Sequence, residues 1–427
     1  MSALLAPDAA LPKRDWLLDT KAVARLLAGT LGADGPLPVG PCELLRIHYR
    51  FGRRLRVLFR LRTGRGWVWV TGRAFPEGQA EAAFHGAAAA ATAACGRLRR
   101  VVHATDAAAV FWTFPNDRKL VSLKTLLREA LAIARELGGP RGHARILAYK
   151  PETSLVLVLH ELSGRATAYA KVYQDGLGEW ARRIHTSLAR QLGPDDPHLA
   201  LAAPAQRAGS GQIVVLEAVD GRRIIDLADG EAVTGTARLG TALATFHTLA
   251  PPPEVPRFTR HEPPRLADAA RLLARACPRV GRQAEALATE LLRRFEPSAE
   301  PPVCLHGDVH AKNGILAGNR AALVDLDKLC LGEPAADLGS YLSLLRYEHL
   351  VGGLGAATER ARATAFLTGY ARRQPLPTPR ALHWHTAAAL LAEQATRAVR
   401  QIRPAALARL DLLLGDASRL LADNVRA

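Results

Sequence analysis

Two stretches of the chain share one pattern of apolar and polar residues, and each predicts three antiparallel strands. Apolar and β-branched residues fill short runs, and Gly, Pro, Ser and Thr residues interrupt them, as in strands that are joined by turns. The predicted strands lie at 46–55, 57–61 and 66–75 in the first copy and at 146–151, 155–160 and 166–173 in the second.

A predicted helix follows the strands in each copy, at 79–94 and at 178–192. The third strand of each copy also carries a basic residue eight positions before an acidic one: Arg73 and Glu81 in the first copy, Lys171 and Glu179 in the second. We interpret the two copies as a repeated unit of one sheet and one helix.

The segment between the copies predicts a turn at 111–117 and a helix at 120–137. Apolar residues recur at helical spacing in this helix, and the Gly-Gly-Pro sequence at 138–140 terminates it. After the second copy, the apolar run 213–217 predicts a buried strand that leads into a turn at Gly221.

The remainder of the chain is mostly helical by pattern, with proline-rich segments between the helices. The predicted helices are 234–249, 266–276, 283–295, 337–347, 357–372, 381–402 and 405–422. Antiparallel strands followed by a helical half predict an α+β fold. No apolar run is long enough to span a bilayer, so we expect no membrane span.

Length and charge refine this picture. At 427 residues the chain is too long for one ordinary core and predicts two or three domains. Its formal net charge is +17, which attracts anions such as ATP and repels polycations. The cysteines are odd in number and lack CxxC spacing, so we expect reduced thiols and a cytoplasmic location. They are Cys42, Cys95, Cys277, Cys304 and Cys330.

The first copy is rich in arginine, with almost no acidic residues among the arginines. These arginines are Arg46, Arg50, Arg53, Arg54, Arg56, Arg60 and Arg62. A solvated sheet face is one interpretation, and a site for an anionic partner is the other. Few aromatic residues lie between the arginines, which disfavours a nucleic-acid platform.

Two short motifs carry the chemistry. They are His306-Gly-Asp308-Val-His310-Ala-Lys-Asn313 and, after the apolar run 321–324, Asp325-Leu-Asp327. Phosphoryl transfer from ATP needs a carboxylate that orients and deprotonates the attacking hydroxyl. It also needs an amide oxygen and a second carboxylate to hold Mg²⁺ on the nucleotide phosphates. This spacing predicts a small-molecule kinase.

Taken in order, these segments resemble the aminoglycoside phosphotransferase and choline kinase family, which has a protein-kinase-like fold. The matching segments are Tyr-Ala-Lys171-Val-Tyr, Leu-Glu217-Ala-Val219-Asp-Gly, the two motifs above and Glu333-Pro-Ala-Ala-Asp337-Leu-Gly. The resemblance covers roughly residues 140–427. It implies a bilobal fold with a small antiparallel-sheet N-lobe and a mainly helical C-lobe.

We therefore predict three parts. Residues 1–120 form an additional N-terminal α+β cap domain that contains the first copy. Residues 121–216 form a linking helix and the N-lobe, and residues 217–427 form the hinge and the helical C-lobe with the catalytic loop.

The catalytic and metal-binding roles follow from spacing and resemblance together. Asp308 is the predicted catalytic carboxylate, and Asn313 and Asp325 are predicted Mg²⁺ ligands. Asp327 shares a face with Asp325 only if the strand continues. It is either a second metal contact or an acid that orders the loop.

Three further residues are predicted to order the catalytic loop. The resemblance implies that His306 does so through backbone hydrogen bonds. His310 either orders the loop or approaches the γ-phosphate, and we favour the first role. Asp337 has the position of a helix N-cap whose carboxylate ties the loop. A zinc site at His306, Asp308 and His310 is disfavoured, because the glutamate of an HExxH motif is missing.

The resemblance also implies a nucleotide site. Lys171 would reach the α- and β-phosphates, with Glu179 as the nearest candidate for its acidic partner. Adenine would lie against the backbone from Glu217 to Val219. Thr153 and Ser154 belong to the turn that would cover the phosphates, and this turn lacks glycine.

We thus predict an enzyme that transfers the γ-phosphate of ATP, with Mg²⁺, to a hydroxyl of a small molecule. Candidate acceptors are a sugar, an amino sugar, an amino alcohol or an aminoglycoside. The alternative is a non-catalytic, nucleotide-binding module with a basic, anion-binding cap. Protein kinase activity is disfavoured, because the chain between Asp325 and Asp337 is too short for an activation segment.

Overall fold

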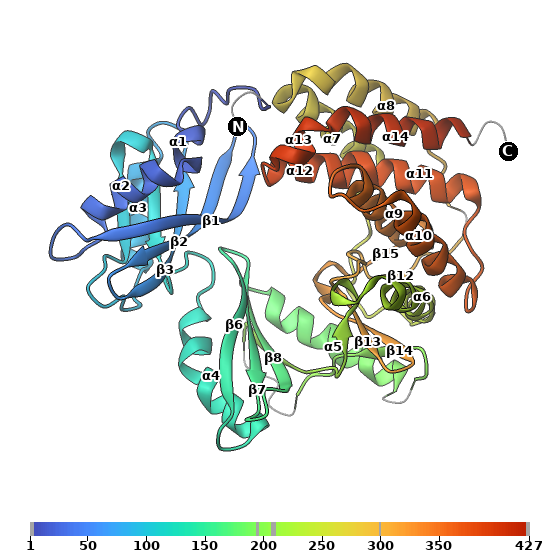
Figure 1. The fold of residues 1–427 in the computed structure, drawn as a ribbon, viewed down its shortest axis with the longest axis horizontal. Helices are drawn as coiled ribbons and strands as arrows, with labels where there is room; N and C mark the ends of the chain where they lie inside the picture. Colours follow the sequence, from blue (N-terminus) through green and yellow to red (C-terminus); the bar gives the residue numbers. More distant parts are fainter. Residues whose placement is uncertain (1–3, 194–195, 206–210, 299, 424–427) are drawn as a thin grey trace. The chain divides into compact units, whose positions relative to one another are not determined.

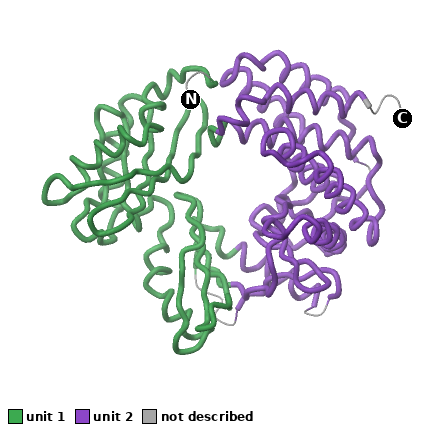
Figure 2. Tube along the Cα trace, viewed as in Figure 1, with its two compact units in different colours: residues 1–179, 209–215, 399–402 green, residues 180–208, 216–398, 403–427 purple. Residues whose placement is uncertain are grey.

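The computed structural model describes residues 4–193, 196–205, 211–298 and 300–423. They form two compact units (Figure 1, Figure 2). Unit 1 comprises Met1–Glu179, Gly209–Val215 and Val399–Ile402. Unit 2 comprises Trp180–Ala208, Leu216–Ala398 and Arg403–Ala427.

Unit 1 begins with a five-stranded antiparallel sheet in the order β1-β2-β3-β5-β4. Its strands are β1 (Val39–Arg50), β2 (Arg54–Thr63), β3 (Gly66–Ala74), β4 (Val101–Ala104) and β5 (Ala109–Thr113). Alternation along β2 explains its place, because Leu55, Val57, Phe59 and Leu61 are all buried on one face. The arginines of β2 therefore point to the opposite face.

Three helices cover this sheet. They are α1 (Arg14–Leu18), α2 (Thr20–Thr30) and α3 (Ala80–Ala90). Helix α1 packs against β2 and β3, α2 packs against β1, and α3 packs against β4 and β5. Tyr49 is fully buried, and its hydroxyl donates to Asp8 Oδ2 at 2.6 Å.

The second sheet of unit 1 has four strands in the order β10-β8-β7-β6. They are β6 (His143–Lys150), β7 (Ser154–His160), β8 (Ala166–Tyr173) and β10 (Ile213–Glu217), of which β10 continues into unit 2. Helix α4 (Leu123–Gly138) lies along β6, β7 and β8 (Figure 1). It ends as predicted, because Gly139 leaves the helix at φ 79°.

The predicted repeat of strands is confirmed. In both copies the three strands pair consecutively and antiparallel, as β1-β2-β3 and as β6-β7-β8. A helix precedes each set (α2 or α4) and another follows it (α3 or α5). The order helix, three strands, helix therefore occurs twice.

Two predictions between the copies are wrong in part. Residues 109–113 form β5 rather than a turn, because Val110, Phe111 and Trp112 are all buried between β3 and β4. The turn residues Pro115 and Asn116 concealed this short apolar run. Helix α3 ends at Ala90, so residues 91–94 are not helical.

Unit 2 is mainly helical. The helices that lie wholly or partly in unit 2 are α5 (Leu177–Leu192), α6 (Asp229–Phe246), α7 (Pro263–Ala276), α8 (Gly281–Arg293), α9 (Pro334–Leu350), α10 (Ala356–Ala371), α11 (Pro379–Ala389), α12 (Thr396–Arg400), α13 (Pro404–Ala408) and α14 (Leu410–Asp423). Helices α6 and α10 pack closely, because a Cβ at Gly240 would overlap the carbonyl oxygen of Phe366. No helix in the described ranges is long and apolar enough to cross a bilayer.

Short strands support the loops of unit 2. One sheet has the order β11-β13-β14-β9, and β12 pairs with β15. The strands are β9 (Leu199–Leu201), β11 (Arg222–Arg223), β12 (Val303–Leu305), β13 (Gly314–Ala317), β14 (Arg320–Leu323) and β15 (Cys330–Gly332).

The C-terminal helices differ from their predicted bounds. The region 381–402 is not one α-helix, because a π-helix, Leu390–Ala395, lies between α11 and α12. The region 405–422 is divided at Arg409 into α13 and α14. Helix α9 begins at Pro334 rather than at Asp337, with proline in the first helical position, where no backbone N–H is needed.

Candidate active site

The loop between β12 and β13 contains the predicted catalytic residues. The side chain of Asp337 binds the backbone of this loop. The carboxylate of Asp337 accepts hydrogen bonds from the backbone N–H of His306 (2.7 Å) and of Gly307 (2.9 Å). His247 Nε2 lies 3.2 Å from the same carboxylate. Burial opposes ionisation, but the His247 hydrogen bond and the loop amides hold the pKa of Asp337 below its usual range.

The sequence predicted Asp337 as the N-cap of its helix, and this prediction is wrong. Glu333 has that position, and Asp337 lies within the first turn of α9. Because its side chain is 1% exposed, it binds the loop backbone rather than its own helix end.

Gly307 allows the loop to turn. Its φ of 73° lies in the left-handed region, and a Cβ there would overlap the carbonyl oxygen of Lys328. Arg260 also donates a hydrogen bond to the Gly307 carbonyl oxygen. The loop thus follows a path that only glycine permits at this position.

Both ring nitrogens of His306 bind the backbone. Nδ1 accepts from the Asp308 N–H at 3.2 Å, which leaves the proton on Nε2 for the carbonyl oxygen of Val324 at 3.1 Å. His306 is fully buried. Neither nitrogen is available to a metal, and no cluster of three His, Cys, Asp or Glu side chains suited to a metal occurs among the described residues.

Asp308 lies in this loop with 17% of its side chain exposed. Lys328 Nζ contacts its Oδ1 at 2.7 Å, and His310 Nε2 lies 4.0 Å from its Oδ2. Burial would raise the pKa of Asp308, but the charge and hydrogen bond of Lys328 lower it below its usual range. Asp308 is therefore ionised at neutral pH.

Hydrogen bonds join the backbone segments that carry the three predicted site residues. Asn313 Nδ2 donates to the carbonyl oxygen of Asp308 at 3.1 Å. The backbone N–H of Val324, next to Asp325, donates to the carbonyl oxygen of Asn313 at 3.0 Å. The pairing of β13 with β14 thus places the backbone of Asn313 beside the residue that precedes Asp325.

Asp325 has a left-handed backbone, with φ 63° and ψ 59°, just after β14. The strand does not continue beyond it, because the 3₁₀ helix Leu326–Lys328 follows. Asp327 is exposed on that helix and so does not share a strand face with Asp325. The predicted role of Asp327 as a second metal contact depended on a continued strand, and the strand does not continue.

His310 is mostly buried beside Asp308. Burial and neighbouring cations lower the pKa of His310 to about 4 against the opposing charge of Asp308, so the imidazole is neutral at physiological pH. Its Nδ1 is buried without a hydrogen-bond partner within the described part of the chain. A buried nitrogen without a partner beside the Asp308 carboxylate is compatible with both predicted roles of His310, a contact with a ligand and the ordering of the loop.

Sequence reasoning missed a buried ionic network behind the loop. Arg260 contacts Glu393 Oε2 at 3.2 Å, and His261 Nε2 lies 3.0 Å from Glu393 Oε1. The π-helix carries Glu393 into this position. Burial opposes ionisation of Glu393, but Arg260 and His261 keep its pKa well below the usual range.

Lys328 and Arg260 also escaped the sequence analysis. Lys328 follows Asp325 by three residues and is one of only eight lysines in the chain, which was a usable signal. Arg260 lies far from the loop in sequence, between Phe258 and His261, and no motif marks it.

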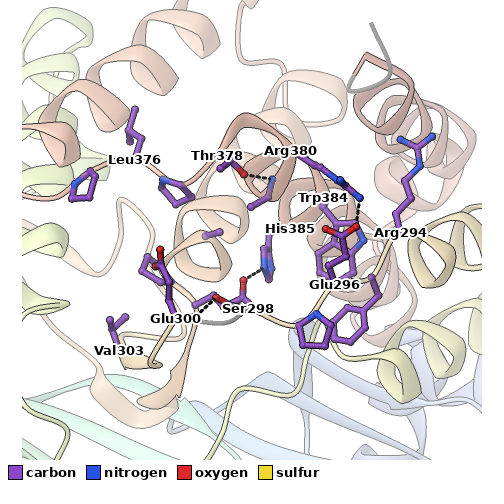
Figure 3. A pocket seen from close by; sticks show the side chains of 18 of the residues that line it. Arg294, Glu296, Ser298, Glu300, Val303, Leu376, Thr378, Arg380, Trp384 and His385 are labelled. Carbon is purple, nitrogen blue, oxygen red and sulfur yellow. Dashed lines mark hydrogen bonds and ion pairs between the residues drawn. The ribbon is translucent and has the colours of Figure 1, made fainter. Parts of the chain in front are cut away.

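A cavity of about 590 Å³ lies elsewhere in unit 2 (Figure 3). Arg294, Glu296, Ser298, Trp384 and His385 are among the side chains that line it. His385 Nε2 lies 3.5 Å from Glu333 Oε2, and His385 Nδ1 lies 3.0 Å from His261 Nδ1. His385 thus links the lining of this cavity to the ionic network of Glu393.

The predicted hinge residues lie in unit 2. Glu217 is the last residue of β10 and is exposed, and its backbone N–H donates to the carbonyl oxygen of Ala203 at 2.9 Å. Val219 packs in an apolar cluster with Ala200, Ile315, Ala322 and Val324. This cluster adjoins the backbone of Asp325.

The remaining predicted nucleotide residues lie in unit 1. Lys171 is buried on β8, with Nζ 4.8 Å from the ring centre of Tyr173. Glu179 is exposed in the first turn of α5. Thr153 is exposed in the β6–β7 turn, and Ser154 is buried opposite Tyr173 at the start of β7.

The β6–β7 turn is fixed by ion pairs rather than made flexible by glycine. Glu152, at φ 57°, lies between Arg56 (2.7 Å), Arg73 (3.1 Å) and Arg118 (3.2 Å). Asp117 accepts hydrogen bonds from the Glu152 N–H and the Tyr149 hydroxyl, both at 2.8 Å. The first sheet and the loop after it thus hold this turn.

This arrangement predicts a pH-dependent contribution to stability. Burial opposes ionisation of Glu152, but the three arginines lower its pKa from 4.5 to about 2. A lowered pKa stabilises the fold above the unfolded-state pKa, and this contribution is lost as the pH falls from about 4.5 towards 2. Glu152→Gln should therefore lower the free energy of unfolding at pH 7 by about 3 kcal/mol.

Denaturant unfolding of wild type and variant at pH 7, 5.5 and 4 measures this effect. The difference should be constant between pH 7 and 5.5 and should narrow at pH 4 and below. Glu77→Gln, at an exposed position, is the matched control and should change little. A Glu152→Gln variant as stable as wild type at pH 7 would contradict the assignment.

The fold and the comparison with known families together identify a phosphotransferase. The chain belongs to the phosphotransferase enzyme family (APH), whose model matches residues 164–376. No curated protein sequence matches the chain.

Several solved structures have a similar fold. A thermostable mutant of the aminoglycoside phosphotransferase APH(4)-Ia, in its apo form, has a TM-score of 0.50 and 14% identity, covering 69% of this chain and 99% of that one. The amicoumacin kinase hAmiN, in complex with AMP-PNP, Ca²⁺ and Ami, has a TM-score of 0.48 and 16% identity, covering 68% and 92%. A choline/ethanolamine kinase family protein from Mesorhizobium loti has a TM-score of 0.46 and 17% identity, covering 70% and 94%.

At these identities the similarity concerns the fold alone. The APH(4)-Ia comparison and the antiparallel sheets with many helices confirm the predicted α+β, protein-kinase-like fold class.

Proposed function

We propose that this protein transfers the γ-phosphate of ATP, with Mg²⁺, to a hydroxyl group of a small molecule. The observation that supports this is the pair of hydrogen bonds described above, which join Asn313 to Asp308 and to Val324, the residue before Asp325. Candidate acceptors are a sugar, an amino sugar, an amino alcohol or an aminoglycoside.

Asp308 acts on the acceptor. Lys328 engages Oδ1, so Oδ2 faces the acceptor and receives the hydrogen bond of its hydroxyl. The hydroxyl oxygen forms a bond to the γ-phosphorus while the bond from that phosphorus to the β–γ bridging oxygen breaks. ADP leaves, and the hydroxyl proton passes to Asp308 late in the transfer.

Asn313 and Asp325 fit a magnesium ion. The Asn313 amide nitrogen is used by the carbonyl oxygen of Asp308, which leaves its oxygen as the remaining acceptor. An amide oxygen and a carboxylate are hard ligands, and Mg²⁺ takes one or two such groups together with substrate phosphates and water. When bound, the ion neutralises charge that develops on the phosphates.

The resemblance to the family motivates the other proposed nucleotide contacts. Lys171 would be the cation for the α- and β-phosphates, with Glu179 as its candidate partner. Thr153 and Ser154 belong to the turn that would cover these phosphates. In unit 2, the backbone from Glu217 to Val219 would hold adenine, because Val219 packs in the apolar cluster beside Asp325.

A screen of acceptors with γ-labelled ATP tests the proposal. Purified protein with Mg²⁺ is incubated with sugars, amino sugars, amino alcohols and aminoglycosides, and label transfer to the acceptor is measured. We expect transfer to at least one class and none without Mg²⁺. ATP binding without turnover on any acceptor would instead favour a non-catalytic module, which the immobilised β6–β7 turn would suit.

A further inference from the structure

The first sheet of unit 1 has a face on which arginines gather across three strands. The strand register places His48 opposite Arg56, and Arg56 opposite Arg73. Arg50 lies opposite Arg54 in the next pair. We call this the arginine face: Arg46, His48, Arg50, Arg54, Arg56 and Arg73 on the strands, with Arg118 from the loop after β5.

Two carboxylates near the arginine face are already engaged. Glu152 forms ion pairs with Arg56, Arg73 and Arg118. Asp117 is occupied by backbone N–H groups and the Tyr149 hydroxyl. Within the described ranges, Arg46 and Arg54 form no ion pair.

Two guanidinium nitrogens on this face have unmet hydrogen-bonding capacity. Arg54 Nε and Arg73 Nε are both buried, and neither has a hydrogen-bond partner in the described part of the chain. A buried donor without an acceptor costs about 1–3 kcal/mol. Arg54 pairs with Arg50 and Arg73 pairs with Arg56, and Arg54 and Arg56 lie two residues apart on β2. Both donors therefore belong to one face of the sheet.

The burial and the charges of the neighbouring residues also favour a bound anion on the arginine face. Burial is the main cause that lowers the pKa of Arg54 and of Arg73, and neighbouring arginines add to it. Burial and the charges of Arg56, Arg54 and Arg50 also lower the pKa of His48 to about 4. The positive charges on this face repel one another, and a bound anion would relieve that repulsion.

Burial decides which anion fits. The Arg56 and Arg73 side chains are only 10% and 14% exposed, too deep for a flat membrane surface or a nucleic-acid strand. A phosphate group offers several acceptor oxygens to the planar fork of a guanidinium. Several arginines close together favour a ligand with more than one negative charge.

We propose that the arginine face is a binding site for a small phosphate-bearing molecule, whose oxygens accept hydrogen bonds from Arg54 and Arg73. The site is built entirely within unit 1. It is independent of whether the chain transfers phosphate.

Calorimetric titration with tripolyphosphate, at fixed salt, tests the proposal without any turnover assay. The variants are Arg54→Gln, which leaves the ion pairs of Glu152 intact, and the double variant Arg54→Gln/Arg73→Gln. Arg62→Gln/Arg65→Gln removes the same charge from exposed positions of the same sheet and is the control.

We expect the double variant to bind tripolyphosphate at least tenfold more weakly than wild type, and Arg54→Gln to bind it severalfold more weakly. The control should bind as wild type does. Equal affinity in all variants, or an equal loss of affinity in the control, would overturn the proposal. So would tighter, Arg54-dependent binding of a single-stranded oligonucleotide or of anionic vesicles.

Discussion

Asp308→Asn is expected to lower kcat by about 10³-fold, because the amide accepts no proton from the acceptor hydroxyl. Asparagine keeps the size of the side chain and the backbone bonds to His306 and Asn313. The KM for ATP and the thermal shift caused by ATP with Mg²⁺ should therefore stay close to wild type. Steady-state kinetics on the best acceptor and a thermal-shift titration measure both.

The control is Asp226→Asn, an exposed aspartate of unit 2 that pairs with Arg223. It should retain wild-type kcat. Full activity in Asp308→Asn would remove Asp308 from the chemistry, whereas a loss of ATP binding in that variant would place it in the nucleotide site instead.

Asp337→Asn is expected to cost both stability and rate. One of the two loop amides that now face carboxylate oxygens would face an NH₂ group, and His247 would lose its charged partner. Because Asp337 is fully buried, we expect the free energy of unfolding to fall by about 3 kcal/mol. Displacement of the loop should lower kcat by about 100-fold.

Asp416→Asn separates these two effects. Asp416 is also largely buried and binds Arg346 and Arg419, away from the loop. It should lose stability in denaturant unfolding while keeping its kcat at a temperature where both variants are folded. An Asp337→Asn enzyme that is destabilised but fully active would show that Asp337 supports the fold and does not position the catalytic loop.

Local sequence patterns were enough to predict most of the helices and strands. The apolar run at 57–61 and the helical spacing along 120–137 depend only on neighbouring residues, and the structure confirms a strand and a helix there. The predicted strand at 46–55 is wrong in part, because a turn after Arg50 separates β1 from β2. The strand at 109–113 was missed because its five residues become recognisable only when β3 and β4 lie on either side.

For the candidate site, too, residues within one local motif could be predicted, and residues brought in by folding could not. The motif placed Asp308, Asn313 and Asp325 in one hypothesis, and their roles remain predictions. Lys328, Arg260 and Glu393 could not be found in this way, because their contacts with the loop or with one another arise from folding. In the sequence, Glu152 has only the features of an ordinary turn residue. Its role could not be predicted, because the three arginines that pair with it are distant in the chain.

The doubled order of helix, three strands and helix gives Arg73 and Lys171 equivalent places in the two halves of unit 1. In the first half, the cation at that place binds Glu152 of the second half. Glu152 also holds Arg56 and Arg118, so one carboxylate of the second half neutralises three cations of the first sheet and the loop after it. Loss of Glu152 would leave all three arginines without this partner, whereas loss of Arg73 would leave Glu152 with two partners.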